Sequence, residues 1–303
     1  MVAETSMILV GDNPFHGISH LSQDRARTRV NEIAETEYAA QLVLSSIGNG
    51  ANGFMFSVSD TTLGILKLMS TRIENQQFAL HAIVPYAYEY VRLATHLGTI
   101  GLAKKLARRI LLSTNLVGIA IGFKGVAGMD AEALMKTYLN YEISRIRSSI
   151  SKSQKLTTIL LHEVVTDVII ALDADWLAKS YIDFLSHRGV KPGFETRNFA
   201  YLVDKFKEWG IDFSEIELVS SFNKVGFQMN PSKLECEKAL NQIPECDVVA
   251  MSILAAGYLR LPEAVQYIET LPNLRGVVVG VSKEKQASET FSLLRKKFVK
   301  SQP

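Results

Sequence analysis

The sequence predicts a single (β/α)8 barrel of the TIM type, in which eight parallel strands are surrounded by helices. Short apolar runs rich in β-branched residues alternate with longer segments of helical period, which is the pattern of repeated βα units. Polar side chains follow directly on two of these runs, at His162-Glu163 and at Thr196-Arg197-Asn198. A barrel builds its active site where its strands end, so both observations favour this architecture.

Nine segments have the length and composition of strands, which is one more than the barrel needs. Either the run at 79–84 or the run at 116–121 must therefore lie outside the ring. The connection from Tyr86 to Met129 is unusually long, and we interpret it as an insertion around residues 87–128. The nine candidate strands are 7–10, 53–58, 79–84, 116–121, 158–161, 193–196, 217–222, 247–253 and 276–281.

Helical periodicity fills the segments between the strands. Pro262 beside Glu263 is typical of a helix start, and Gly189 and Gly210 follow apolar helical stretches as C-terminal stops. No linker rich in Pro, Gly or Ser divides the chain, so we expect one domain over residues 1–303. The predicted helices include 22–44, 129–149, 176–186, 200–209, 232–242, 262–270 and 283–298.

The composition limits the class of protein. Apolar residues make up 47% of the 303 residues and charged residues 21%, and the formal net charge of +2 requires neither a nucleic acid nor a membrane as partner. Two cysteines, Cys236 and Cys246, do not make a disulfide framework and suit a reducing compartment. The sequence shows neither a membrane-spanning run nor a signal peptide, so we expect a cytoplasmic location. The expected partners are a small-molecule substrate and, as an option, further copies of the chain.

Residues 102–112 form an amphipathic basic segment within the predicted insertion. Lysines and arginines alternate there with leucine and isoleucine. The favoured interpretation is a surface helix that packs its apolar stripe on the barrel, and the alternative is docking on an anionic surface or a partner subunit.

Four residues are predicted to be catalytic. Asp12 and His16 follow the first strand, and His162 and Glu163 follow the strand at 158–161. Either histidine could act as an acid or base near neutral pH, and His162 could polarise a substrate carbonyl. The structural alternatives are a chain-reversing turn around His16 and a core histidine at 162. A metal site built from these four residues is conceivable, but their spacing is not diagnostic, so no metal is predicted.

Six residues are predicted to bind a cofactor or an anionic group. Arg197 could pair with an anion, and Asn198 and Asn223 could orient an amide or a hydroxyl. After the last strand, Gly280, Ser282 and Lys283 combine close backbone approach, a helix start, a hydroxyl donor and a positive charge, which favours phosphate binding. The alternative for Ser282 is an ordinary N-cap.

From Met129 onward the order of elements resembles that of the aldo-keto reductase superfamily. The resemblance covers a little over half of the chain and rests on five short runs. They are ILLHE at 159–163, HRGVKPGFETRNF at 187–199, SSFN at 220–223, VVAMSILAAGYLRLPEAVQYI at 248–268 and VVVGVSKEKQASETF at 277–291.

The resemblance implies a barrel that reduces a small carbonyl compound with NADP(H). It implies that His162 binds the substrate carbonyl, that Asn198 binds the nicotinamide amide, and that Gly280, Ser282 and Lys283 hold the cofactor phosphates. The family also has an Asp and a Tyr after its second strand and a Lys on its third, where this chain reads FMFSVSDTTLGI and LHAIVPYAYEY. Tyr86 or Tyr88 could replace the missing Tyr on geometry, and Arg197 stands where a small Ser is usual.

Three functions stay open on the sequence. The first is an NADP(H)-dependent oxidoreductase acting on a small carbonyl compound. The second is a non-redox lyase or isomerase acting on a small phosphorylated or carboxylated metabolite, with His16 or His162 as the acid–base and Lys283 or Arg197 as the anion clamp. The third is a non-catalytic binding protein on a diverged barrel. Fold alone does not choose among them.

Overall fold

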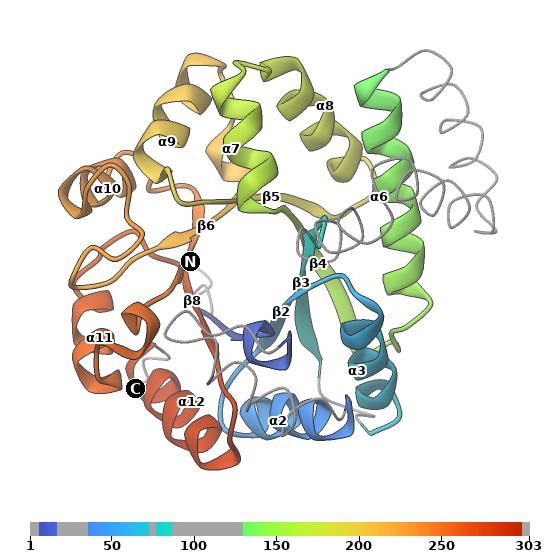
Figure 1. Cartoon of the computed structure of the whole chain (residues 1–303), viewed down its shortest axis with the longest axis vertical. Coiled ribbons are helices and arrows are strands. Elements are labelled where there is room, and N and C mark those ends of the chain that lie inside the picture. The colour runs from blue at the N-terminus through green and yellow to red at the C-terminus, as the bar shows by residue number, and fades with distance from the viewer. Residues whose placement is uncertain (1–5, 17–35, 73–76, 87–129, 299–303) are drawn as a thin grey trace, which may run out of the picture.

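A closed barrel of eight parallel strands forms the centre of the computed structural model (Figure 1). The structure describes residues 6–16, 36–72, 77–86 and 130–298. The strands follow one another around the ring in chain order, and β8 pairs with β1 from Met7↔Gly276 to Gly11↔Gly280. This pairing closes the ring and confirms the predicted (β/α)8 barrel.

The eight strands agree with eight of the nine predicted ones, and the segment at 79–84 belongs to the ring as part of β3. The ninth candidate, at 116–121, lies outside the described residues, as do the insertion at 87–128 and its basic segment at 102–112. The strands are β1 (Met7–Gly11), β2 (Gly53–Ser57), β3 (Phe78–Val84), β4 (Gln154–Leu161), β5 (Lys191–Thr196), β6 (Glu217–Ser221), β7 (Asp247–Met251) and β8 (Gly276–Gly280).

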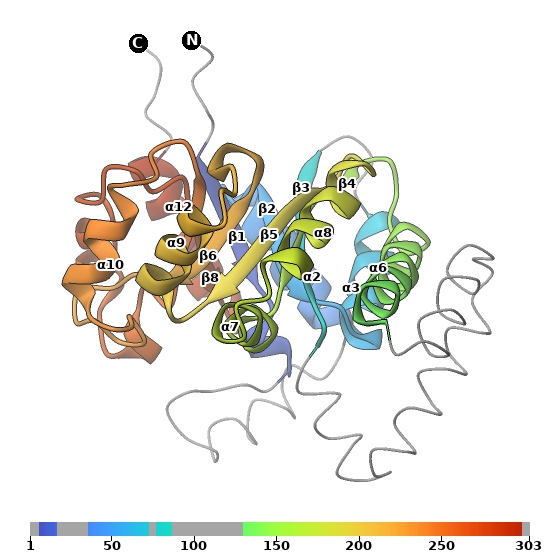
Figure 2. The same ribbon diagram turned by 90° about the horizontal axis from the view of Figure 1, so that it is seen from above.

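Helices surround the barrel on its outside (Figures 1 and 2). Helix α2 begins at Thr36, so the first part of the predicted helix at 22–44 falls on residues that are not described. Gly189 and Gly210 have φ angles of 67° and 68°, which confirms both as the glycine stops of their helices. The α-helices are α2 (Thr36–Gly48), α3 (Asp60–Ser70), α6 (Ala131–Arg147), α7 (Glu163–Ala171), α8 (Asp175–Ser186), α9 (Phe199–Glu208), α10 (Lys233–Leu240), α11 (Leu261–Ile268) and α12 (Glu284–Phe298).

Two of these helices were not among the predicted ones. Helix α3 follows β2 directly, and α7 stands between β4 and α8, where the sequence analysis placed only the helix at 176–186. Figure 2 shows α7 beside the arrowhead of β5, at the carboxyl end of the barrel. Helix α8 is the usual crossover helix between β4 and β5, so α7 is an additional element on the rim of the mouth.

Two apolar layers explain why the strands read as nearly continuous apolar runs. Side chains that point outward, such as Ile8, Phe54 and Phe194, join one large core with the helices. Those that point inward form a separate cluster inside the ring, made of Leu9, Met55, Ile83, Leu160, Val219 and Val249. Because successive strand residues face opposite sides, this inner cluster identifies the other inward positions on each strand.

The inside of the barrel also carries a polar network. His81 Nδ1 lies 2.9 Å from Glu217 Oε1, and the Thr158 hydroxyl donates to Glu217 Oε2 at 2.8 Å. These three buried residues join β3, β4 and β6 across the interior. None of the described helices is long and apolar enough to cross a membrane.

Candidate active site at the carboxyl ends of the strands

Asp12 and His16 form the first part of the candidate site. Asp12 follows β1, and its Oδ2 accepts a hydrogen bond from the backbone N–H of Ser57 at the end of β2 (2.7 Å). The same oxygen lies 2.9 Å from Nε2 of His16, which belongs to the 3-10 helix η1 (Asn13–His16). Asp12 therefore ties β1 to β2 and orients the imidazole of His16.

Tyr86 is the neighbour of His16 on the other side. It follows β3, and its ring centroid lies 4.8 Å from that of His16. The chain of contacts Asp12–His16–Tyr86 thus joins the carboxyl ends of three neighbouring strands. An imidazole held by a carboxylate next to a phenol is an arrangement that can move a proton.

His162 lies at the end of the next strand. Its backbone N–H donates to the carbonyl of Val84 (2.8 Å), which places it beside the segment that leads to Tyr86. Its Nδ1 accepts from the backbone N–H of Val164 (3.2 Å) as the N-cap of α7. Burial lowers the pKa of His162, and the nearby Arg197 lowers it further, whereas Glu163 raises it. At neutral pH the ring is uncharged, with its proton on Nε2.

Helix α7 holds the end of β5 through its carboxylates. Arg197 donates from Nε to Oε2 of Glu163 at 2.5 Å. The Thr196 hydroxyl and the Asn198 amide donate to the two oxygens of Asp167 at 2.6 and 2.9 Å. Burial raises the pKa of Asp167, and these two hydrogen bonds oppose the shift. The predicted residues Glu163, Arg197 and Asn198 are therefore brought together at the mouth, each with a partner from the rim.

Glu195, like Asp167, is an acidic residue of the site that the sequence analysis missed. It lies on β5 between Phe194, which is in the outer core, and Thr196, so its side chain faces the barrel interior. Its Oε2 accepts from the backbone N–H of Glu163 (3.4 Å). Burial raises its pKa to about 8, and the charges of Glu163 and Asp12 raise it as well. Strand alternation alone was the signal that could have identified it.

The other predicted cofactor residues lie at the same end of the barrel, after β6 and β8. Asn223 uses Oδ1 and Nδ2 to bond the backbone N–H and carbonyl of Phe227, each at 2.8 Å, so it closes its own loop. A Cβ on Gly280 would come within 2.8 Å of the Pro14 ring, which is a packing reason for the glycine. Ser282 donates its backbone N–H to Oε1 of Gln286 (3.0 Å), and Lys283 is exposed.

A metal centre has no support in the part of the chain that the structure describes. No group of three or more His, Cys, Asp or Glu side chains is arranged there to hold an ion. The acidic side chains at the mouth instead have His16, Arg197 and backbone N–H groups as partners.

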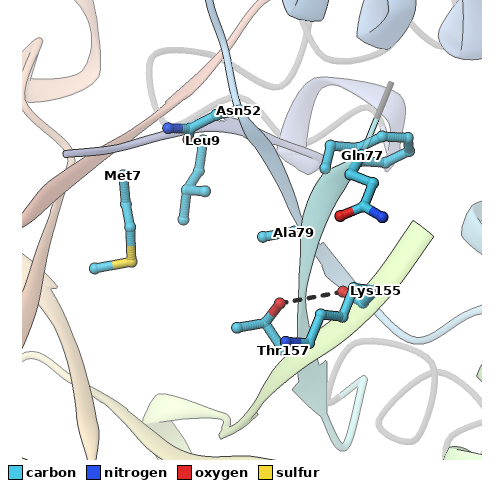
Figure 3. A pocket seen from close by; sticks show the side chains of 8 residues that line it. Met7, Leu9, Asn52, Gln77, Ala79, Lys155 and Thr157 are labelled. Atoms are coloured by element: carbon cyan, nitrogen blue, oxygen red, sulfur yellow. Dashed lines mark hydrogen bonds between the residues drawn. The ribbon is translucent and has the colours of Figure 1, made fainter. Parts of the chain in front are cut away.

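A pocket of about 280 Å³ lies at the opposite end of the barrel (Figure 3). It is formed by residues at the amino ends of β1 to β4, the end at which barrels keep residues for stability. Asn52 in its wall is already bonded to the backbone of Ser6 and Ile8. The lining residues are Met7, Leu9, Asn52, Gln77, Phe78, Ala79, Lys155 and Thr157.

Comparison with solved structures identifies the fold. A proposed aldo-keto reductase from Pseudomonas aeruginosa superposes with a TM-score of 0.58 at 11% identity, over 95% of this chain and 90% of that one. The fold is that of the aldo-keto reductases. The glycerol dehydrogenase of Gluconobacter oxydans, with a TM-score of 0.54 at 9% identity over 97% and 90% of the two chains, has the same fold. No family model matches the sequence, and no curated protein is a significant match.

The contacts at the mouth can be compared with the residues that the sequence resemblance implied. The sequence resemblance implied an Asp after the second strand, and here the carboxylate of Asp12 reaches the end of that strand from β1. It implied a Lys and a Tyr, and here the tilted rings of His16 and Tyr86 lie 4.8 Å apart near the end of β3. Asp60, the acidic residue that the sequence offers after β2, instead starts α3 on the outside and pairs with Arg145 (2.5 Å).

Proposed function

We propose that this protein is an oxidoreductase that reduces a small carbonyl compound with NADPH, with Tyr86 as proton donor and His162 as the group that binds the carbonyl oxygen. The observation that carries the proposal is the contact chain Asp12–His16–Tyr86 beside His162. It provides an acid and a carbonyl-binding group at the mouth of a barrel that has the aldo-keto reductase fold.

His162 is suited to bind the carbonyl oxygen because its tautomer is fixed. Val164 N–H occupies Nδ1, so the proton of the neutral ring is on Nε2. A neutral N–H donor polarises a carbonyl without adding a charge that would have to be neutralised later. Burial keeps the pKa of His162 below its ordinary value, so this state persists at neutral pH.

Tyr86 is suited to give the proton because His16 lies against its ring. A phenol protonates a forming alkoxide best when its own anion is stabilised, and a neighbouring imidazolium provides that stabilisation. Asp12 in turn holds the imidazole of His16 in place through the 2.9 Å contact. In this proposal the pair Asp12–His16 does for Tyr86 what the family's Lys does for its Tyr.

The residues after β5 and β8 supply the groups that a dinucleotide needs. Ser282 and Lys283 offer a hydroxyl and an ammonium group next to the positive end of α12, and they would hold the phosphates. Arg197 and Asn198 would lie beside the nicotinamide ring of the dinucleotide. When bound, the reduced nicotinamide supplies the hydride for the carbonyl carbon. Asn223 is left out of this set because its amide already closes its own loop.

The test is NADPH-dependent reduction of a panel of small aldehydes and ketones, with NADPH binding followed by fluorescence. We expect Tyr86→Phe to lower kcat by about 10²–10⁴-fold, because it removes the proton donor, with NADPH binding unchanged. Tyr201→Phe changes an exposed tyrosine of α9 and should leave kcat unaffected. Failure of the wild type to bind NADPH, or full activity of Tyr86→Phe, would contradict the proposal.

A non-redox lyase or isomerase is the second candidate, and Glu195 is the observation that favours it. A carboxyl with a pKa of about 8, bonded to the backbone N–H of the residue after a neutral His162, gives the mouth a second acid–base group that works near neutral pH. Turnover of a carbonyl compound without any nicotinamide, lost in His162→Ala, would select this candidate over the first.

A further inference from the structure

Glu195 and Ser221 are neighbouring inward-facing residues that the proposed reductase reaction does not use. Glu195 is on β5, and its register partner on β6 is Val219, a member of the inner cluster. Ser221 is the next inward residue along β6, one step closer to the mouth. Both side chains therefore point into the barrel at the end where the candidate site lies.

The hydroxyl of Ser221 is fully buried, and Oγ has no hydrogen-bond partner among the described residues. Its neighbour in the chain, Ser220, donates to the carbonyl of Thr196 at 2.8 Å. The outward-facing serine therefore has a hydrogen-bond partner, whereas the inward-facing Ser221 has none among the described residues. A buried hydroxyl without a partner is costly unless something else bonds to it. Ser221 thus indicates a polar ligand group inside the mouth.

The carboxyl of Glu195 lies next to the residue that would bind the carbonyl. Its Oε2 is 3.4 Å from the backbone nitrogen of Glu163, the residue directly after His162. His162, which follows β4, and Glu195 on the adjacent strand β5 can reach two oxygens on adjacent carbon atoms of one small molecule. A protonated carboxyl group is a hydrogen-bond donor as well as an acceptor.

The charges around the mouth limit which molecule this is. Asp12, Glu163 and Asp167 bring carboxylates, and Arg197 is already paired with Glu163. A phosphate or carboxylate on the substrate would meet these acidic groups at close range, which is unfavourable. A neutral hydroxyl group meets no such penalty.

We infer that Glu195 and Ser221 select substrates that carry a neutral hydroxyl on the carbon next to the reacting carbonyl. Glu195 donates to that hydroxyl oxygen, Ser221 forms a second hydrogen bond to it, and His162 holds the carbonyl oxygen beside it. The substrate class is thus a small 2-hydroxy aldehyde or 2-hydroxy ketone. This inference rests on the proposed function and names the substrate of the same site.

The test compares propanal with 2-hydroxypropanal, two aldehydes that differ by one hydroxyl, in NADPH-dependent turnover. A site built to bond a hydroxyl rejects the analogue without it, so kcat/KM should favour 2-hydroxypropanal by about 10²-fold or more. Glu195→Leu should reduce this preference to near 1, and Ser221→Ala should reduce it about tenfold. Glu289→Gln, at an exposed position of α12, is the control and should leave the preference intact.

The pH profile separates a hydrogen-bond donor from a structural carboxyl. Glu163 from α7, Asp12 after β1 and Arg197 after β5 are the charged groups that face Glu195. In the wild type the preference for 2-hydroxypropanal should change as the pH rises through about 8, because ionisation turns Glu195 from a donor to the substrate hydroxyl into a charged acceptor from it. Glu195→Gln keeps the shape and an N–H donor, so its preference should be independent of pH. A preference that stays pH-independent in the wild type would overturn the inference.

A binding measurement distinguishes failure of this inference from failure of the proposed function. Calorimetry compares 1,2-propanediol with 1-propanol on the wild type and on Glu195→Leu, with Glu195→Gln measured as well in case the leucine variant does not fold. If neither aldehyde is reduced but the diol binds more tightly to the wild type alone, the reductase proposal fails and the hydroxyl site stands. Equal binding of both alcohols to the wild type, or tighter binding of lactate than of the diol, overturns the inference.

Discussion

At the scale of single residues, the pKa values of the two central groups of the candidate site are both shifted toward the uncharged form. Burial and two neighbouring carboxylates raise the pKa of Glu195 to about 8, and burial lowers that of His162. At neutral pH both are uncharged and both carry a proton. The mouth therefore holds two neutral hydrogen-bond donors within an acidic rim, which suits oxygen atoms of an uncharged molecule better than an anion.

The raised pKa of Glu195 predicts a pH-dependent stability. The ordinary pKa of 4.5 applies to the unfolded chain and about 8 to the folded protein, so between these values the folded state binds more protons. The free energy of unfolding should therefore fall as the pH rises from 5 to 8.5, by about 2–4 kcal/mol from this residue. Glu195→Gln should lack this slope. Urea unfolding of both proteins at several pH values is the measurement, and parallel curves would contradict the prediction.

The candidate site residues at strand ends could be predicted because their signal is local. Asp12, His16 and His162 each follow directly on an apolar run, so the strand pattern alone places them at the mouth. Glu195 lies inside its strand, and its raised pKa depends on burial and on the charges of Glu163 and of Asp12, which is more than 180 positions away in the chain. The contact of His16 with Tyr86 likewise exists only once three strands are in register.

At the scale of elements, the two helices that the sequence analysis missed both support the site. Helix α3 begins just after Ser57, whose N–H holds Asp12, and α7 carries Glu163 and Asp167. Both helices contain residues of low helix propensity, which is why the sequence pattern did not predict them. The start of α3 is rich in Ser and Thr and contains Gly64, and α7 is rich in β-branched residues, which have low helix propensity.

The start of α3 depends on a reciprocal capping box. The Ser59 hydroxyl accepts from Thr62 N–H (3.1 Å), and the Thr62 hydroxyl accepts from Ser59 N–H (3.0 Å). Ser59→Ala should lower the free energy of unfolding by about 1–2 kcal/mol, since a backbone donor at the helix start loses its partner. Thr61→Ala, at an exposed position of the same turn, is the control and should have little effect. Equal urea midpoints for Ser59→Ala and the wild type would refute a role for the cap.

At the scale of the whole molecule, barrel closure brings together residues from both ends of the chain. The fold could be predicted because each βα unit carries its own pattern, and eight such units can close only in a few ways. Closure itself depends on contacts between distant strands, such as the pairing of β8 with β1. The polar network inside the ring is a further contact of this kind, and no local pattern reveals it.

The pair His81–Glu217 allows a test of whether side chains interact across the barrel interior. It joins β3 to β6 across the interior at 2.9 Å, and both side chains are almost fully buried. His81→Leu or Glu217→Leu alone should cost about 3–5 kcal/mol, because each leaves a buried polar partner without its counterpart. The double variant removes both and should be less destabilised than the sum by at least about 1 kcal/mol. It should not recover fully, since the Thr158 hydroxyl also loses its acceptor.

Urea unfolding of the four proteins measures the coupling, and Glu217→Leu combined with the exposed Lys179→Ala should be additive. Additive costs for His81 and Glu217 would mean that the two side chains do not interact across the barrel in solution.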